Sequence, residues 1–374
     1  MPNPISQLLQ ESIDAGDLPS AVYLVAEKGD IVFHEALGHA VVEPERIEAQ
    51  RDTIYDLASL TKPLVTGLLL AKMLESQELH LDQTLGDLFP WGNFSDKESI
   101  PLKDLLTHTS RFPAWLPFYL LTARAAEVTA KILEQPLNGY AKQVTYSDLN
   151  FLLLAAVITD LRNSSLDGTA SSEIFKPLEL IDTSFDPDIA LRKRIAASEK
   201  GNAYEKQTCI GLGYLGPDQV EKNLSAFREY QIWGEVHDGN AWFMGGVAGH
   251  AGLFSTAEEV FRIAQQFLPN YTALLKPDTC ELFRTNFTPG MNEDRSLAFQ
   301  LASTKDSTAG MKMPPESFGH LGFTGTSVWI DPVKERVFIL LTNRTHNHPP
   351  PFANINSLRR RFHDLAIGLL DKQK

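Results

Sequence analysis

The first forty residues predict one helix followed by two strands. In residues 4–15, apolar side chains recur at helical spacing and form one face. These side chains are Ile5, Leu8, Leu9 and Ile13. Residues 21–40, which read AVYLVAEKGDIVFHEALGHA, are typical of two strands joined by the turn Lys28-Gly29-Asp30.

The C-terminal part has the same elements. Residues 326–343, TSVWIDPVKERVFILLTN, predict two strands around Asp331-Pro332. Residues 353–372 predict a final helix, whose apolar stripe consists of Leu358, Phe362, Leu365 and Leu369. Both ends of the chain therefore supply strands and a helix.

The middle of the chain has a different pattern. Apolar spacing predicts long helices at 60–76 and 148–161, whereas 185–240 is polar and predicts irregular structure. We therefore expect an α+β fold, in which an antiparallel sheet built from both chain ends is flanked by helices and carries an inserted helical region. The expected domains are 1–60 with 240–374 (α/β) and 61–239 (mainly helical), with the active site between them.

Composition narrows the class of protein. The chain has 374 residues, of which 43% are hydrophobic and 22% charged, as in ordinary globular proteins. A net charge of −13 opposes binding to nucleic acid or to an anionic membrane surface. Apolar runs such as Leu149–Ile158 are too short to span a bilayer. The N-terminal residues lack a signal-peptide pattern, which favours a cytoplasmic location, and Cys209 and Cys280 are then expected as free thiols.

Two motifs are more typical of loops than of cofactor or metal sites. Residues 211–216, GLGYLG, match a dinucleotide fingerprint, but Pro217 follows at once and the preceding segment is polar, so a glycine-rich loop is favoured. Residues 345–348 hold two histidines without a carboxylate or thiol nearby in sequence, which favours a solvated loop over a metal site.

Ser59 and Lys62 form the chain's one Ser-x-x-Lys motif, at the start of the apolar segment 60–76. Three-residue spacing places both side chains on one helix face, about one turn apart. A serine hydroxyl needs a neighbouring base, and a lysine partly desolvated at a helix start can have the lowered pKa that such a base requires. The alternative is a helix N-cap serine beside a surface lysine.

Two further segments carry polar groups suited to a site. Tyr146-Ser147-Asp148 precedes an apolar run, and its structural alternative is a strand-end tyrosine followed by a helix N-cap. His320-Leu321-Gly322 leads into a predicted strand, where the glycine lets the backbone approach a ligand closely.

In their order, these motifs resemble the signature of the penicillin-binding protein and serine β-lactamase superfamily: Ser-x-x-Lys, Tyr-x-Asn, then Lys/His-x-Gly. The chain is most similar to the branch that holds class C β-lactamases, D-Ala-D-Ala carboxypeptidases and related esterases. LKDLLTHTS at 102–110 and GGVAGHAGLFSTAEEV at 245–260 also resemble segments of that branch. The resemblance covers about residues 20–345.

The resemblance implies roles for individual residues. Ser59 would attack a carbonyl and form an acyl-enzyme, and Lys62 and Tyr146 would exchange the proton, with the primary base left open. The backbone N–H groups of Ser59 and Phe323 would form the oxyanion hole. His320 would replace the lysine of the β-lactamases, to donate to the substrate or to set the charge near Tyr146. The chemistry implies no metal or organic cofactor.

The chain departs from the family pattern at several positions. Asp148 replaces an asparagine that contacts substrate, and Leu321 replaces a threonine that helps to bind a substrate carboxylate. Arg344, just past the last strand, is a candidate to supply that positive charge instead. Arg111 replaces a glycine in the loop after His108, which we expect to be structural. These changes disfavour β-lactam or D-Ala-D-Ala substrates and leave ester hydrolysis intact.

Three functions remain open. The favoured function is a serine hydrolase acting on a small ester, amide or peptide substrate. The second is a penicillin-binding or sensor module that acylates without turnover, and the third is a nucleotide-dependent enzyme that uses GLGYLG. The sequence leaves the oligomeric state undetermined.

Overall fold

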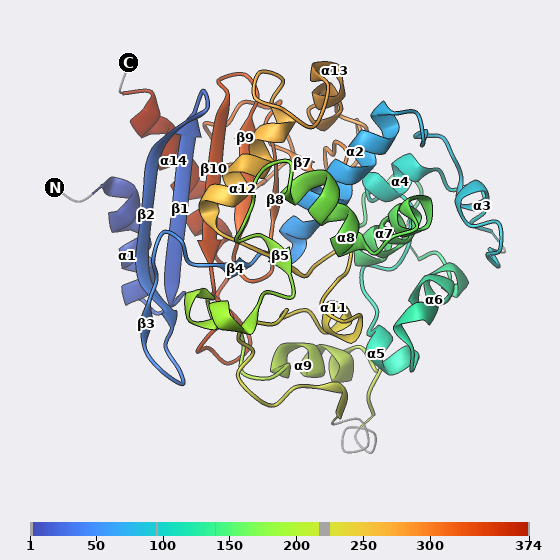
Figure 1. Ribbon diagram of the computed structural model, residues 1–374, viewed down its shortest axis with the longest axis horizontal. Coiled ribbons are helices and arrows are strands. Elements are labelled where there is room, and N and C mark those ends of the chain that lie inside the picture. The colour runs from blue at the N-terminus through green and yellow to red at the C-terminus, as the bar shows by residue number, and fades with distance from the viewer. Residues whose placement is uncertain (1–2, 95, 139, 217–224, 373–374) are drawn as a thin grey trace.

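A seven-stranded antiparallel sheet forms the centre of the computed structural model, which describes residues 3–94, 96–138, 140–216 and 225–372. The first and last strands of the chain are neighbours in it, since Ala21 pairs with Thr342 (Figure 1). The strands, in sheet order, are β3 (Ile47–Glu48), β2 (Asp30–Val41), β1 (Ser20–Glu27), β10 (Arg336–Thr342), β9 (Ser327–Asp331), β8 (Phe318–Leu321) and β7 (Gln300–Leu301). The predicted α+β fold with a sheet from both chain ends is confirmed.

Strand β1 is buried on both faces because helices cover both sides of the sheet. Tyr23 and Val25 pack in a core with α1 (Pro4–Asp14) and α14 (Asn356–Leu370). The alternate residues of β1 pack on the other face in the main core, together with α12 (Ala257–Ala264). A strand that alternates between two cores reads as a continuous apolar run.

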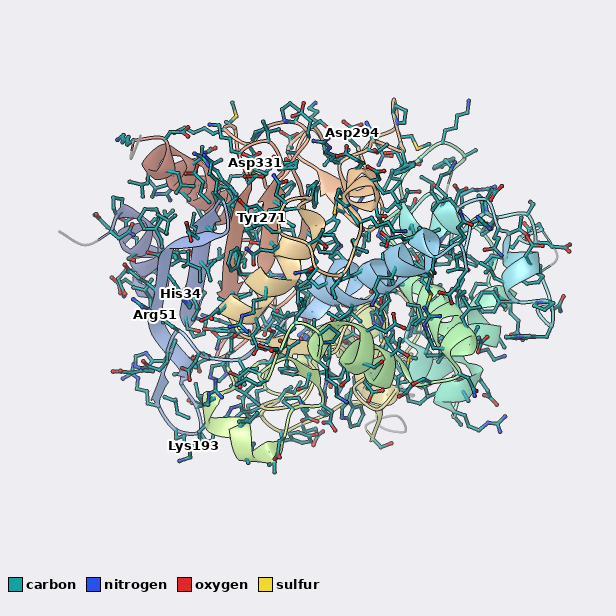
Figure 2. The ribbon with its side chains drawn as sticks, turned by 45° about the horizontal axis from the view of Figure 1, so that its top comes forward. His34, Arg51, Lys193, Tyr271, Asp294 and Asp331 are labelled. Atoms are coloured by element: carbon teal, nitrogen blue, oxygen red, sulfur yellow. The ribbon has the colours of Figure 1, made fainter. Side chains whose placement is uncertain are left out.

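The turn between β9 and β10 lies where the sequence predicts it, at Asp331-Pro332. The carboxylate of Asp331 accepts hydrogen bonds from the backbone N–H groups of Val333 (2.9 Å) and Lys334 (3.0 Å). Figure 2 labels Asp331 at this end of the sheet. A short acidic side chain that bonds to the backbone two residues on is a common way to close such a turn.

Helices dominate the segment between the sheet strands. They are α2 (Leu68–Glu75), α3 (Leu85–Leu88), α4 (Leu102–Leu106), α5 (Phe118–Leu121), α6 (Val128–Glu134), α7 (Asp148–Arg162), α8 (Leu166–Ala170), α9 (Ala203–Gly211) and α11 (Gly239–Phe243), with α13 (Pro277–Cys280) later in the chain. A small sheet also forms, in the order β4 (Tyr55–Asp56), β6 (Leu253–Ser255), β5 (Ser184–Phe185). The division into domains at 60/61 and 239/240 stays a prediction.

Two local predictions hold only in part. The helix expected at 60–76 is divided into a 3-10 turn at Ala58–Leu60, a π-helical segment at Lys62–Gly67 and then α2. The segment 185–240, expected to be irregular, contains α9. Helix α9 buries one charged residue, Glu205, and lacks the apolar stripe by which a helix is recognised in a sequence.

The structure also shows where the two motifs interpreted as loops, 211–216 and 345–348, lie in the fold. GLGYLG begins at the last residue of α9 rather than after a strand, so it lacks the strand–turn–helix context of a dinucleotide site. The loop at 345–348 was expected to be solvated, but His346 is buried. Its Nε2 accepts from the backbone N–H of Val42 (2.8 Å) and its Nδ1 lies 2.9 Å from the carbonyl of Ser198, so it joins three segments. Within the described ranges, no helix combines the length and apolar character needed to cross a membrane.

Candidate active site

Ser59 lies on a tight turn that a buried carboxylate holds in place. Asp56 accepts hydrogen bonds from the backbone N–H groups of Ala58 (2.8 Å) and His237 (2.7 Å). Ala58 has a φ of 48°, in the left-handed region that a residue with a Cβ rarely adopts. Such strain persists where the surrounding contacts fix the backbone, and here it directs Ser59 into a cavity.

Lys62 is fully buried and its ammonium has three partners. Nζ lies 2.9 Å from Ser59 Oγ, 3.0 Å from the carbonyl oxygen of His250 and 2.7 Å from Asp148 Oδ1. The contacts with Ser59 and His250 are hydrogen bonds, and the contact with Asp148 is an ion pair. Ser59 and Lys62 are therefore in contact, and the alternative of a surface lysine is wrong.

The expectation of a lowered pKa for Lys62 is also wrong. Burial opposes the charge, but the carboxylate of Asp148 and the neighbouring Tyr146 outweigh it and raise the pKa of Lys62. The sequence alone suggested desolvation, whereas the structure adds a counter-ion that is supplied by the first residue of α7. Lys62 therefore rests as an ammonium that donates to Ser59.

Tyr146 completes the predicted catalytic group. Its ring centroid lies 5.1 Å from Lys62 Nζ and 5.5 Å from the guanidinium carbon of Arg295. His108 packs on the same ring at 4.5 Å between centroids, and its Nδ1 accepts from the backbone N–H of Ser147 at 3.0 Å. His108 thus has the structural position expected of it, and it fixes the loop that carries Tyr146.

His320 lies on the other side of Tyr146, with 5.8 Å between ring centroids. Burial, with the nearby cations Lys62 and Arg295, holds the pKa of His320 well below its ordinary value, so the imidazole is neutral. Its Nδ1 lies 2.9 Å from the carbonyl oxygen of Leu321, which assigns the proton to Nδ1. Nε2 is buried without a partner among the described residues, and His320, which the sequence predicted to bind substrate, is not among the residues that line the cavity beside Ser59.

Gly322 lets the end of β8 approach the nucleophile loop. A Cβ at this position would lie 1.9 Å from Thr326 Oγ1 and 2.5 Å from the carbonyl oxygen of Leu57. The hydroxyl of Thr326 donates to that same carbonyl (3.0 Å), and Thr324 donates to the carbonyl of Asp56 (2.8 Å). The β8–β9 turn is therefore tied to the residues that precede Ser59.

We expect Gly322→Ala to destabilise the protein and to disturb the site. Forcing a methyl group into a packed region typically costs about 1–3 kcal/mol, and here the added atom would displace the β8–β9 turn from Leu57. Thermal unfolding and ester turnover would be measured beside Gly211→Ala, where a Cβ meets nothing within 4 Å. Equal stability and turnover in the two variants would contradict the proposed close approach.

Arg344 has a different position from the one expected of it. Its Nε donates to the carbonyl of Phe323 (2.8 Å) and its Nη1 to the carbonyl of Ala353 (2.6 Å), while its guanidinium packs over the Phe323 ring. It does not line the cavity beside Ser59. Arg344 therefore holds Phe323 in position, and its charge does not face a substrate.

The cavity beside Ser59 has a volume of about 320 Å³. Among the aromatic residues of the nearby loops, Trp115 lines the cavity, whereas Phe118 and Trp233 are buried in the core and Tyr119 bonds to Glu205. The described residues that line it are Ala58, Ser59, Trp115, Tyr146, Asp148, Tyr204, Glu205, Thr208, Leu212, His237, Asp238, Ala251 and Phe323. It thus gathers Ser59, Tyr146, Asp148 and Phe323 from segments far apart in the sequence.

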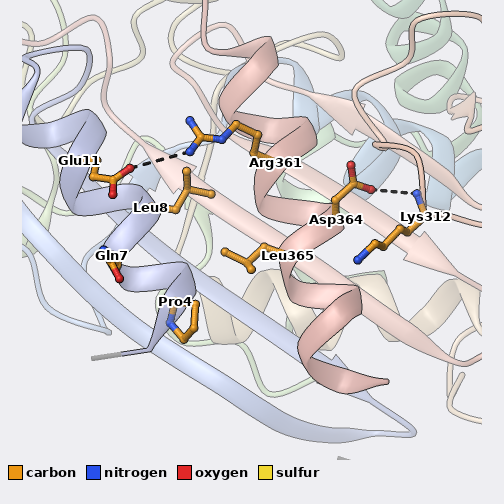
Figure 3. Close-up of a pocket in the computed structure, with 8 residues that line it drawn as sticks. All are labelled: Pro4, Gln7, Leu8, Glu11, Lys312, Arg361, Asp364 and Leu365. Carbon is orange, nitrogen blue, oxygen red and sulfur yellow. Dashed lines mark hydrogen bonds and ion pairs between the residues drawn. The ribbon is translucent and has the colours of Figure 1, made fainter. Parts of the chain in front are cut away.

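A second opening, between α1 and α14, has no comparable chemistry. In Figure 3, Arg361 is directed at Glu11, and Asp364 accepts a hydrogen bond from the backbone N–H of Lys312. None of the described residues that line it is a serine or a cysteine. The candidate active site is therefore the smaller cavity at Ser59.

Sequence reasoning missed two carboxylates of this cavity. Asp238 caps α11 by accepting from the N–H of Ala241 (2.8 Å), and its Oδ1 also lies 3.0 Å from Nε2 of His250. Glu205 accepts from Tyr119 Oη (2.8 Å) and from the N–H of Gly239 (2.7 Å). Burial and then the neighbouring Asp238 raise the pKa of Glu205 to about 7. A polar segment without periodicity gives no signal for either residue.

Asp148, Asp238 and His250 place potential ligand atoms within 4.8 Å of one another. The ammonium of Lys62 already pairs with Asp148 at 2.7 Å and would repel a second cation there. We therefore interpret these groups as the surroundings of Lys62, rather than as a metal site.

The fold and the sequence comparison together define a serine hydrolase of the β-lactamase family. The sequence model of the β-lactamase family matches residues 5–360. The chain belongs to the β-lactamase family, as its motifs predicted.

Individual relatives span different activities. A protein of Escherichia coli (strain K12) with the provisional name D-alanyl-D-alanine carboxypeptidase is 28% identical over 376 residues, covering 92% of this chain and 82% of its own. A class C β-lactamase from Rhodobacter sphaeroides has a TM-score of 0.72 and 16% identity, over 99% of this chain and 100% of that one. EstCE1, a hydrolase with promiscuous acyltransferase activity, has a TM-score of 0.71 and 19% identity, over 97% of each chain. These structural likenesses concern the fold alone.

Proposed function

We propose that this protein hydrolyses small carboxylic esters through an acyl-enzyme on Ser59. The observation that carries the proposal is the contact of Ser59 Oγ with Lys62 Nζ, at 2.9 Å, beside a cavity that Tyr146 also lines. A serine becomes a nucleophile when an adjacent group accepts its proton. Of the two candidate acceptors, Lys62 contacts Ser59 and Tyr146 lines the same cavity.

In acylation, Ser59 Oγ forms a bond to the substrate carbonyl carbon while its proton passes to the base. The backbone N–H groups of Ser59 and Phe323 would bind the resulting oxyanion; both residues line the cavity. The carbon–oxygen bond of the ester then breaks, and the departing alkoxide takes the proton from the protonated base. Because Lys62 rests as an ammonium, it acts as the base only after it has lost a proton.

In deacylation, a water molecule replaces the alcohol and the steps run in reverse. The base takes a proton from water, the hydroxide adds to the acyl carbon, and the bond to Ser59 Oγ breaks. Ser59 recovers its proton, and the carboxylic acid leaves. Asp148 and Asp238 both line the cavity and offer acceptors that can hold this water.

The charges of the site favour esters over β-lactams and D-Ala-D-Ala peptides, which both carry a carboxylate. Leu321 has no hydroxyl for such a group, His320 is neutral, and Arg344 is bound to carbonyl oxygens. Three carboxylates line the cavity instead. A substrate carboxylate would meet charges of its own sign and lose affinity.

The proposal is tested by incubating the protein with p-nitrophenyl acetate and, separately, with a fluorescent penicillin. We expect steady release of p-nitrophenolate and a transient acetyl group on Ser59, detected by mass spectrometry of quenched samples. Penicillin is expected to label weakly or not at all. The absence of both turnover and a Ser59 adduct with either reagent would overturn the proposal.

A second function is favoured by the Asp148–Lys62 ion pair, since a base held in its protonated form slows both steps. The protein would then be a penicillin-binding or sensor module that acylates without turnover. A stable, stoichiometric penicillin adduct on Ser59 with no ester turnover would support this alternative.

A further inference from the structure

The lining of the active-site cavity combines negative charge with aromatic rings. Asp148, Glu205 and Asp238 line it, and among the described lining residues there is no lysine or arginine. Four aromatic side chains line the same space: Trp115, Tyr146, Tyr204 and Phe323. Carboxylates and aromatic faces are the two groups that attract an organic ammonium ion.

The basic side chains Lys62 and His250 do not line the cavity. Lys62 pairs with Asp148 at 2.7 Å, and His250 approaches Asp238 at 3.0 Å, but neither is a lining residue. The guanidinium of Arg228 donates to the carbonyl oxygens of Val236 and His237. A ligand in the cavity therefore meets carboxylate oxygens, while the positive groups lie behind them.

His237 is the one lining residue with an imidazole, and its charge is balanced by a carboxylate of its own. Its Nε2 lies 2.8 Å from Glu199 Oε2 in a buried pair. Its ring also stacks on Phe323, with 5.4 Å between centroids and 17° between planes. His237 therefore supports an aromatic wall and adds no net charge to the cavity.

Glu205 and Asp238 are the two carboxyl groups of the lining that form no ion pair with a lysine or arginine among the described residues. The N–H of Gly239, next to Asp238, donates to Glu205 Oε1 at 2.7 Å, which joins the two residues through the backbone. Both contacts found for Asp238 among the described residues involve Oδ1, so Oδ2 is available to a ligand. Asp238 contributes to the raised pKa of Glu205, so the two carboxyl groups repel each other when both are charged, and a bound cation would relieve that repulsion.

Two of the aromatic rings that line the cavity, those of Tyr204 and Phe323, are neighbours. Tyr204 and Phe323 lie 4.8 Å apart between ring centroids, and Tyr204 is the residue before Glu205. Faces arranged in this way stabilise a quaternary or primary ammonium group from several sides. The carboxyl and aromatic groups thus line one cavity, which Ser59 also lines.

We propose that the enzyme selects esters that carry an ammonium group close to the scissile carbonyl, recognised by Glu205, Asp238 and the aromatic wall of Tyr204 and Phe323. The inference rests on the proposed hydrolysis at Ser59 and specifies its substrate class. Neutral esters of the same shape are poorer substrates, and esters with a free carboxylate are the poorest.

The test compares esters matched in shape and different in charge. For the acyl side, the probes are the p-nitrophenyl esters of trimethylammoniobutanoate, of its isostere with a tert-butyl group, and of glutarate. For the alcohol side, they are acetylcholine and dimethylbutyl acetate. In at least one pair we expect kcat/KM to be about tenfold higher for the cationic ester.

Variants identify the groups responsible. Glu205→Gln and Asp238→Asn should each reduce the ratio of kcat/KM between the cationic ester and its isostere. The ratio is the readout because the neutral ester corrects for general damage to the site. Glu229→Gln, which removes an exposed carboxylate outside the cavity lining, should leave the ratio unchanged. A ratio near one for both pairs in the wild type, or a ratio that both variants retain, would overturn the inference.

A binding measurement distinguishes a failure of this inference from a failure of the proposed hydrolysis. Calorimetry with choline and with dimethylbutanol measures the preference without any turnover. Preferential binding of choline that Glu205→Gln weakens would support the ammonium site, even if no ester were hydrolysed and the proposed hydrolysis failed. Equal binding of the two alcohols, or binding of neither, would reject the site even if Ser59 hydrolysed neutral esters.

Discussion

Ser59→Ala is expected to lower kcat/KM for p-nitrophenyl acetate by roughly a thousandfold or more, because the acyl-enzyme cannot form without the hydroxyl oxygen. Lys62 would keep its contacts with Asp148 and the carbonyl of His250, so the buried ammonium stays paired. The fold should therefore survive, with a melting temperature close to that of the wild type. Initial rates of p-nitrophenolate release and thermal unfolding are the two measurements.

Ser99→Ala is the matched control, since Ser99 is exposed and does not line the cavity. It should retain wild-type turnover. A Ser59→Ala variant that kept more than about a tenth of the activity would assign hydrolysis to another group. Loss of activity together with a large fall in melting temperature would instead indicate that Ser59 is needed for folding.

The fold was predictable because its signals are local. Consecutive residues are enough to predict that β1 is a buried strand and that the chain turns at Asp331-Pro332. The pairing of β1 with β10 follows once both ends of the chain are recognised as strands. The division of the segment 60–76 was not predictable, since a π-helical start has the same apolar residues as an α-helix.

The site was predictable only where its residues lie in motifs. Ser59, Lys62 and Tyr146 were found because spacing and order identify them. The charge of the site was not predictable, because it depends on residues that are distant in the chain. Asp148 raises the pKa of Lys62, and the guanidinium of Arg344 donates its hydrogen bonds to carbonyl oxygens. Desolvation can be guessed from an apolar sequence, but a counter-ion contributed by another helix cannot.

The same reasoning explains why the acidic lining was missed. Glu205 and Asp238 lie in the segment 185–240, which has no periodic pattern, and each is held by groups that the sequence does not place nearby. The family resemblance led to a search for a positive charge that binds a substrate carboxylate. The cavity beside Ser59 is instead lined by carboxyl groups, which is why we infer a cationic substrate.

The Asp148→Asn variant should shift the pH dependence of hydrolysis to lower pH. In the wild type, burial lowers the pKa of Lys62, but the Asp148 carboxylate outweighs it, so the net pKa is raised and kcat/KM should climb with pH into the alkaline range. With asparagine, burial acts without that opposition and the pKa of Lys62 falls. At pH values where kcat/KM still rises with pH, Asp148→Asn should exceed the wild type by about tenfold for each pH unit by which the profile is shifted.

The measurement is kcat/KM for a neutral ester from pH 5 to 10, with Asp160→Asn as control, since Asp160 is exposed near the other end of α7. A shift of the rising limb to lower pH in Asp148→Asn alone would identify Lys62 as the base. An unshifted limb with reduced activity would assign the base to Tyr146, with the Lys62 ammonium acting by its charge. Because the variant restores the family's amide while it removes the ion pair at 2.7 Å, it also tests whether Asp148 restrains turnover.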